Sequence, residues 1–291
     1  MIYNIAHKTV YRYSAPVPLA HHLLRLRPRD TARQICQSCE IIIEPEPSVR
    51  ADHADYFGNL TRFVSVEGGH ASLTVTARSR VEVTPAPDLP FGKTPPWELA
   101  REQCLESWDD EPRGAAEFLF DSPLIRTVPI YAGYAAPCFP PGRPLLEGVM
   151  ELTRRIHRDF QFDPQATTIA TPVDEVFDNR RGVCQDFAHL EIACLRSLGI
   201  PARYVSGYIE TAPPPGGERL AGADASHAWI AVYCAGSGWV DFDPTNNVAP
   251  SSRHVTVAWG RDYSDVSPIR GVILGSGDHS LSVAVDVVPL T

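Results

Sequence analysis

The alternation of apolar and polar residues over residues 70–83, HASLTVTARSRVEV, constrains the fold of this chain more than any other feature. One face of an extended chain would carry Ala71, Leu73, Val75, Ala77, Val81 and Val83. The opposite face would carry Ser72, Thr74, Thr76, Arg78, Arg80 and Glu82. This period of two predicts a β-strand with one buried and one solvated face. Other strands must pair with it and cover its apolar side.

The rest of the N-terminal region supplies those partners. The segments HLLRLRPR and CEIIIE are rich in apolar residues and predict two further strands. In DYFGNLTRFVSV, Gly58 and Asn59 lie between two aromatic-rich runs, which is typical of a β-hairpin. We therefore expect residues 1–88 to form an antiparallel β-sandwich domain.

A proline-rich segment separates this region from a second one. Five prolines between Pro85 and Pro96 prevent regular structure, so residues 89–96 are assigned as a linker. Beyond it, the segment PLLEGVMELTRRIHRDF places apolar residues three or four apart, which predicts an amphipathic helix. Strands follow near the C-terminus, in HAWIAVYC, GWVDFD, IRGVILG and HSLSVAVDVV. Residues 97–291 are therefore expected to form one α+β catalytic domain.

Composition narrows the classes of function. The formal net charge of −9 disfavours nucleic acid and anionic membranes as partners, because both require a basic face. We find no run of 18 apolar residues and no apolar signal core near the start, so a cytoplasmic protein is expected. Seven cysteines, an odd number, indicate mostly reduced thiols. Cys36 and Cys39 form a lone CxxC without further ligands at zinc spacing, so we interpret them as structural residues of a strand.

Cys184 in DNRRGVCQDFAHL is the candidate nucleophile. A helical pattern begins at this residue, and the free N–H groups and dipole of a helix N-terminus stabilise a thiolate. Gly182 would let the chain turn into the helix, and Arg180 and Arg181 add positive charge nearby. Cys194 lies on the apolar face of the same predicted helix, where a free cysteine packs as core.

A cysteine nucleophile needs a base and a group that orients the base. His227 opens the predicted strand HAWIAVY, and the following strand of the hairpin ends in an acidic segment. With the turn centred on the Gly-Ser pair of AGSG, simple register places Asp243 opposite Ile230 and Asn246 opposite His227. Register alone therefore leaves Asp241, Asp243 and Asn246 as candidate orienting residues.

The motifs GVCQDFAHL, SHAWIAVY and GWVDFDPTNN, in this order, closely resemble those of the transglutaminase-like superfamily. The segments YNIAHKTVYRYSAPV, LRLRPRD and DYFGN, with the C-terminal tail, resemble bacterial members that carry their own N-terminal β domain. The resemblance implies a papain-like α+β fold with a Cys–His–Asp triad. Carried over by residue, Cys184 is the nucleophile, His227 the base, and Asp243, in Asp-Pro-Thr, the orienting acid.

The resemblance also implies the reaction, which is acyl transfer through a thioester. A peptide or protein amide is the expected substrate. Hydrolysis by a peptidase or amidase is the favoured outcome, with transamidation and a non-catalytic peptide-binding module as alternatives. No metal or organic cofactor is expected. The N-terminal domain could shape the cleft, recognise an extended substrate or mediate homo-oligomer formation.

Other polar residues have simpler interpretations. Asp186 is expected to cap the helix that begins at Cys184, and His189 to lie on the side of that helix. His21 and His22 are adjacent on a predicted strand and so face opposite ways, which argues against joint metal binding. Asp55, before Gly58 and Asn59, is interpreted as part of a turn.

Overall fold

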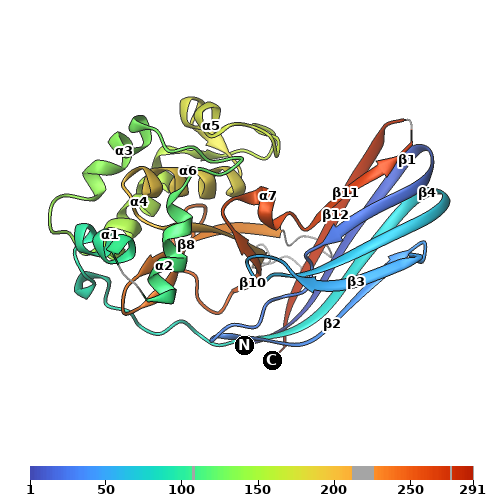
Figure 1. The fold of residues 1–291 in the computed structure, drawn as a ribbon, viewed down its shortest axis with the longest axis horizontal. Helices are drawn as coiled ribbons and strands as arrows, with labels where there is room; N and C mark the ends of the chain where they lie inside the picture. The colour runs from blue at the N-terminus through green and yellow to red at the C-terminus, as the bar shows by residue number, and fades with distance from the viewer. Residues whose placement is uncertain (107–108, 212–225, 276, 291) are drawn as a thin grey trace, which may run out of the picture.

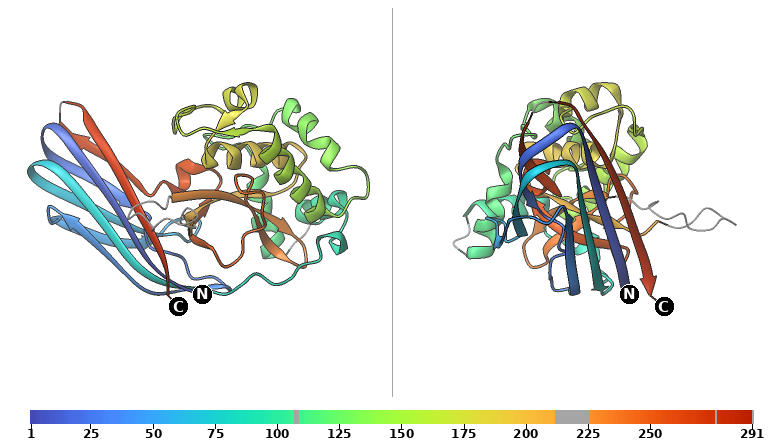
Figure 2. Two further views of the ribbon diagram at one scale, coloured as in Figure 1. Left: turned by 180° about the vertical axis from the view of Figure 1, so that it is seen from behind. Right: turned by 90° about the vertical axis from the view of Figure 1, so that its right-hand side faces the viewer.

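The computed structural model describes residues 1–106, 109–211, 226–275 and 277–290. It consists of a β-sheet part and a mixed helix-and-sheet part that lie side by side (Figure 1). The N- and C-terminal ends meet at the base of the β-sheet part, where Ile2 pairs with Leu290 (Figure 2). Within the described ranges, no helix is both long and apolar enough to cross a bilayer.

The β-sheet part is a six-stranded antiparallel sheet built around two long, paired strands. The strands are β1 (Ile2–Leu24), β2 (Gln34–Glu44), β3 (Val49–Ala54), β4 (Leu60–Val83), β11 (Ile269–Leu274) and β12 (His279–Leu290). β4 pairs with β1 on one side and with β2 and β3 on the other, while β1 also pairs with β11 and β12. The predicted alternation of residues 70–83 is confirmed in β4, whose apolar side chains are buried.

The long strands fold over on themselves, so that one sheet makes a sandwich. The pairing of β1 with β4 is irregular between Arg12 and Val17, and this irregularity divides the sheet into two halves. Residues from both halves share one core, which contains Leu24, Val64, Val66, Leu73, Val75, Ala77 and Ile43. The expected β-sandwich is therefore present, and its two layers are halves of a single continuous sheet.

The C-terminal strands lie in a different part of the protein from the one predicted. β11 pairs with Leu19–Leu24 of β1, and β12 pairs with Ile2–Tyr13. We expected these strands in the domain of residues 97–291, but they belong to the N-terminal sheet. A hairpin that alternates in sequence does not reveal its partner, because any open sheet edge can accept it.

Over its described residues, the mixed part contains seven α-helices and a four-stranded sheet in the order β10-β7-β8-β9. Its helices are α1 (Trp97–Glu106), α2 (Asp110–Ala116), α3 (Pro129–Ala135), α4 (Leu145–Asp159), α5 (Val173–Asn179), α6 (Cys184–Ser197) and α7 (Tyr263–Val266). Its strands are β5 (Gln161–Phe162), β6 (Arg181–Gly182), β7 (Ala202–Ile209), β8 (Ser226–Cys234), β9 (Gly238–Phe242) and β10 (His254–Gly260). Short 3₁₀ turns span Phe91–Lys93, Glu117–Leu119 and Ala136–Cys138. This α+β core confirms the predicted fold class.

Helix α6 is the central element of this part (Figure 1). It packs on β8 and β7, and most of its residues are fully buried because helices also cover it from the other side. The helix ends before Gly199, which adopts a left-handed φ of 78° that a residue with a side chain rarely takes. The predicted amphipathic helix is confirmed as α4, whose apolar residues contact the same core.

The two parts are joined by a buried interface. Tyr3, Ile5, Val285 and Val287 of the N-terminal sheet belong to the same apolar core as helix α6. Asn59, which is 0% exposed, receives a hydrogen bond from the backbone N–H of Trp259 and donates one to its carbonyl oxygen, at 3.0 and 2.9 Å. Leaving a buried amide without its hydrogen-bond partner destabilises a fold, so these bonds hold β10 against the β3–β4 turn.

Candidate active site

Cys184 is the first residue of α6 and is half-buried. The preceding residue, Val183, is extended, and its backbone N–H donates to the Asp186 carboxylate at 2.8 Å. The predicted capping role of Asp186 is confirmed by this bond. Gly182 is required for a different reason than a tight turn, because a Cβ there would lie 2.7 Å from the same carboxylate. The local sequence therefore fixes the Cys184 thiol at the positive end of a helix.

The two arginines before Cys184 have other partners. The Arg180 guanidinium lies over the rings of Phe177 and Phe160, at 4.3 and 4.7 Å from their centroids. Arg181 is exposed, and its guanidinium lies 4.0 Å from the Asp163 carboxylate. The expected positive charge at the thiol therefore comes from the helix terminus and from the histidine described next.

His227, the second residue of β8, lies between Cys184 and Asp243. Its Nε2 is 2.8 Å from the Asp243 Oδ2 atom, and its side chain also hydrogen-bonds with that of Cys184. A carboxylate oxygen can only accept, so Nε2 carries the hydrogen and Nδ1 is left to face the thiol. The structure thus brings the predicted cysteine, histidine and aspartate together in one chain of contacts.

The hairpin register that carries Asp243 differs from the predicted one by one residue. Ile230 pairs with Phe242, and Cys234 pairs with Gly238. The connection therefore has three residues, 235–237, instead of two, and it is made possible by left-handed glycines at 236 and 238, with φ of 81° and 71°. Asp243 follows the end of β9 in a turn and reaches His227 from there.

Asp241, the neighbouring acidic candidate, does not contact His227 in the described structure. Strand residues two apart face the same way, but Asp243 has left the strand. The Asp241 carboxylate lies 3.7 Å from the Arg33 guanidinium of the N-terminal part. Asn246, the remaining candidate, contacts both residues: its Nδ2 donates to the Asp243 Oδ2 at 2.7 Å and lies 3.3 Å from the His227 Nε2.

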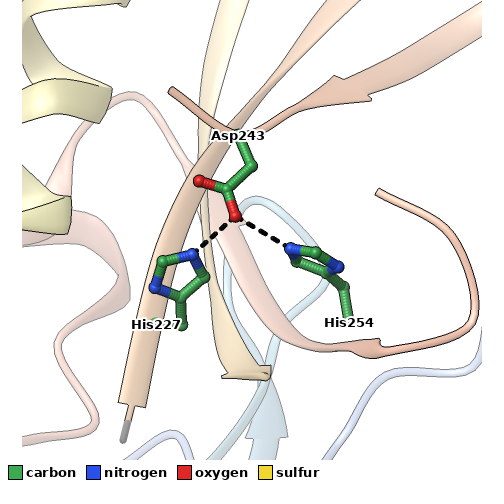
Figure 3. A group of neighbouring side chains, drawn as sticks. All are labelled: His227, Asp243 and His254. Carbon is green, nitrogen blue, oxygen red and sulfur yellow. Dashed lines mark hydrogen bonds and ion pairs between the residues drawn. The ribbon is translucent and has the colours of Figure 1, made fainter. Parts of the chain in front are cut away.

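Hydrogen bonds fix the Asp243 carboxylate, which is 0% exposed. Its Oδ1 accepts from the backbone N–H groups of Thr245 and Asn246, at 2.9 and 3.1 Å. Its Oδ2 accepts from His227, from Asn246 and from a second histidine, His254, whose Nε2 lies 2.9 Å away (Figure 3). Such a set of donors stabilises the charged form and fixes the direction in which Oδ2 points.

The pKa values of the pair follow from these contacts. Burial lowers the pKa of His227, but the hydrogen bonds to Asp243 and Cys184 outweigh it and raise that pKa to about 10. Burial raises the pKa of Asp243, yet the hydrogen bonds from the two histidines hold it well below its usual range. At neutral pH the site therefore favours an imidazolium held by a carboxylate.

His254 was not found from the sequence. It lies in β10, and its ring packs edge-on against Trp229, with centroids 5.2 Å apart. No local motif marks it, because its relation to Asp243 depends on β10 pairing with β7 and on the turn after β9. A histidine without a neighbouring motif is more often a satisfied structural residue, so sequence reasoning passes over it.

His227, Asp243 and His254 also meet a geometric criterion for a metal site, since one ligand atom from each lies within 4.8 Å of the others. The two N···O distances of 2.8 and 2.9 Å are those of N–H···O hydrogen bonds. A nitrogen that binds a metal must offer a lone pair, whereas a nitrogen that donates a hydrogen bond to Asp243 carries a hydrogen at the same position. The arrangement therefore fits a hydrogen-bonded network around one carboxylate better than a cation site.

A pocket with a volume of about 250 Å³ opens at the nucleophile and is lined by Cys184, Gln185 and His227, together with Tyr204 and Tyr263. Larger hollows of about 580 and 550 Å³ lie elsewhere, and neither is lined by Cys184 or His227. The smaller pocket is therefore the candidate substrate site, because Cys184 and His227 line it.

Two other residues of α6, Cys194 and His189, are structural groups. Cys194 is 0% exposed, and burial raises the pKa of its thiol well above the ordinary value. His189 accepts a hydrogen bond from the backbone N–H of Tyr263 at 3.2 Å, and burial lowers its pKa to about 4. Cys194 is core, as predicted, and His189, which was expected on the side of the helix, is buried as well. Cys184 is the thiol of α6 that lines the pocket.

Comparison with known proteins agrees with this architecture. Residues 3–82 match the bacterial transglutaminase-like N-terminal region, and residues 134–244 match the transglutaminase-like superfamily. An uncharacterized protein of Mycobacterium tuberculosis is 41% identical over 99% of this chain and 92% of its own length. A protein-glutamine gamma-glutamyltransferase of Pseudomonas aeruginosa is 36% identical over 31% of this chain and 15% of its own length.

A crystal structure from Cytophaga hutchinsonii, described as a "Putative Cysteine Protease", superposes with a TM-score of 0.76 at 20% identity. The match covers 100% of this chain and 92% of that one, so both parts of the fold are shared. Three findings therefore agree: family models match both parts, one relative is similar over nearly the whole chain, and the fold is shared. This chain belongs to the transglutaminase-like superfamily, as a member with the bacterial transglutaminase-like N-terminal region.

Proposed function

We propose that this protein is a cysteine-dependent acyl-transfer enzyme that hydrolyses an amide bond through a thioester on Cys184. One observation carries the proposal. The imidazole of His227 is bound through Nε2 to the Asp243 carboxylate, which leaves Nδ1 at the thiol at the start of α6. Nucleophile, base and orienting group in contact are the arrangement that acyl transfer by a thiol requires.

The first step is proton transfer and attack. The Cys184 thiol gives its proton to His227 Nδ1, and the raised pKa of this histidine favours the resulting imidazolium. The sulfur then attacks the amide carbonyl carbon, a C–S bond forms, and the carbonyl oxygen becomes an oxyanion. The backbone N–H of Cys184, at the start of the helix, is one donor for this oxyanion because the first N–H groups of a helix have no intrahelical acceptor.

The second step releases the amine. His227 returns the proton through Nδ1 to the amide nitrogen, the C–N bond breaks, and the acyl group stays on sulfur as a thioester. Water then gives a proton to Nδ1 and attacks the thioester carbon, the C–S bond breaks, and the free acid leaves. Asp243 remains ionised throughout and stabilises each imidazolium, while His254 and Asn246 keep its Oδ2 directed at His227.

Transamidation is the second candidate, because the Pseudomonas aeruginosa relative that matches part of this chain is named as a glutamyltransferase. It shares every step up to the thioester, and an amine then replaces water. Hydrolysis is preferred because water needs no binding site of its own, whereas an amine acceptor must be bound and water excluded.

The test compares products and variants on one set of donors. The protein is incubated with peptide amides, with and without a primary amine, and products are weighed by mass spectrometry. The proposal predicts free acid in both cases, and its loss in Cys184→Ala but not in Cys39→Ala, which removes a half-buried thiol of β2. Amine adducts in place of free acid would establish transamidation, and equal activity in both variants would contradict the cysteine mechanism.

A further inference from the structure

The pocket at Cys184 is completed by the N-terminal sheet. Besides residues of the catalytic part, it is lined by Tyr11 and Thr9 of β1 and by Leu281 and Val283 of β12. The strand pairing explains why these four residues face it together, since Tyr11 lies opposite Leu281 and Thr9 opposite Val283. Cross-strand partners point to the same side of a sheet.

This side of the sheet is continuous with the buried interface between the two parts. Farther along the same strands, Ile5 lies opposite Val287, and both are buried in the apolar core that contains α6. The sheet is therefore fixed against the catalytic part at one end of this face. The pocket lies where that contact ends and the face opens beside Cys184.

The sheet side of the pocket is neutral. Among the described residues, the pocket is lined by no aspartate, glutamate, lysine or arginine. His7 of β1, which also lines the pocket, has both ring nitrogens engaged, with the Tyr208 hydroxyl and with Thr9 Oγ1, each at 3.0 Å. Burial lowers the pKa of His7 to about 4, which keeps it uncharged at neutral pH. A charged group of a substrate would therefore find no counter-ion among the described residues on this side.

The same side offers apolar surface that is still open to solvent. Leu281 and Val283 are 54% and 51% exposed, although they lie on the face that is buried farther along β12. Covering such side chains with an apolar group is favourable, whereas placing an unpaired charge against them is costly. The volume of about 250 Å³ is below the roughly 300 to 1,000 Å³ of sites for drug-sized ligands, so it suits one large side chain.

We propose that β1 and β12 form the acyl-side specificity pocket of this enzyme, and that the pocket selects substrates with an uncharged, apolar side chain on the residue whose carbonyl is attacked. The inference rests on the proposed function of Cys184 and adds to it the class of substrate. Thr9, Tyr11, Leu281 and Val283 are the specificity-determining residues, and the N-terminal sheet is part of the active site.

The test uses two irreversible probes that differ only in one side chain. Acetyl-Ala-Ala-Leu and acetyl-Ala-Ala-Glu chloromethyl ketones are alkylating agents, in which the thiolate displaces chloride and a C–S bond forms. The full-length protein is treated with each, and the rate of modification at Cys184 is followed by peptide mass spectrometry. We expect the leucine probe to react roughly tenfold faster or more, as apolar pockets discriminate at this level.

A matched pair of variants locates the selectivity. Val283→Arg places a positive charge in the pocket and is expected to reverse the preference toward the glutamate probe. Ser282→Arg places the same charge on the neighbouring residue of β12, which faces the opposite side of the sheet, and is expected to keep the preference of the wild type. Both positions are exposed, and thermal unfolding of each variant confirms that the fold is kept.

The outcomes separate the inference from the proposed function. Equal rates for the two probes, or the same change in both variants, would overturn the specificity pocket while leaving Cys184 as the nucleophile. If neither probe modifies Cys184 faster than Cys39, the proposed function itself is contradicted, and the pocket assignment is lost with it.

Discussion

Replacement of Asp243 by asparagine tests how the site is held together. The Asp243 Oδ2 atom accepts from His227, His254 and Asn246, and each donor lies within 2.9 Å. An amide at this position is neutral, and it would have to offer a single acceptor oxygen to the same three donors. It no longer stabilises an imidazolium, and it can bind the His227 tautomer that carries its hydrogen on Nδ1, which cannot take a proton from Cys184.

The expected loss is large. Without the carboxylate, the effects that raise the pKa of His227 to about 10 are mostly removed, and burial alone lowers it. Loss of an orienting aspartate from a triad reduces turnover by on the order of 10³- to 10⁴-fold, or about 4 to 5 kcal/mol of transition-state stabilisation. The assay is kcat/KM for amide hydrolysis, with circular dichroism to establish that the variant is folded.

Asp241→Asn is the matched control, because Asp241 is an acid two residues away whose carboxylate lies near Arg33 and not near His227. It is expected to keep kcat/KM close to that of the wild type, because the substitution leaves the hydrogen bonds between Asp243 and His227 and between Asp243 and His254 in place. The reasoning is refuted if Asp243→Asn retains wild-type activity, or if the two variants lose activity equally.

Three further predictions concern pH, reactivity and packing. The pKa of His227 is raised from 6.5 to about 10, so the protonated histidine contributes folding stability that is fully present below pH 6.5 and is lost as the pH rises toward 10. For the same reason kcat/KM should fall near pH 10, and a pH–rate profile that falls near pH 7 would contradict this. Iodoacetamide at mildly acidic pH should label Cys184 faster than the fully buried Cys194, as peptide mass spectrometry would measure; equal rates would count against a reactive pair. Gly207→Ala should destabilise the fold by roughly 1 to 3 kcal/mol, measured by urea unfolding, because the new Cβ would clash with the Val255 carbonyl oxygen of the neighbouring strand. An unchanged unfolding midpoint would show that β7 and β10 can separate freely.

Local sequence signals predicted the parts of the site that short motifs carry. The helix that begins at Cys184 and the strand that contains His227 both have clear periodicity, so both elements were predicted correctly, the strand to within one residue of its start. The register of the β8–β9 hairpin was one residue off, because two left-handed glycines allow a three-residue connection that reads like a two-residue turn. The resemblance to a family, rather than the register, selected Asp243.

Long-range pairing could not be predicted from the sequence. The alternation in β12 indicates a strand but carries no information about which edge it joins, and it joins β1 of the other domain. The role of His254 could not be predicted either, since its contact with Asp243 requires both the β10–β7 pairing and the turn after β9. The pocket at Cys184 depends on the pairing of β12 with β1, because residues of both strands line it, so neither domain alone reveals it.

The central claim is that Cys184 carries the acyl group, and trapping that intermediate tests it most directly. The protein is mixed with a peptide amide donor, quenched in acid within one turnover and digested, and the modified residue is located by mass spectrometry. The account predicts a thioester on Cys184 that disappears as free acid forms and that is absent in Cys184→Ala. Product formation without any acyl adduct on Cys184, or an adduct on another residue, would contradict it.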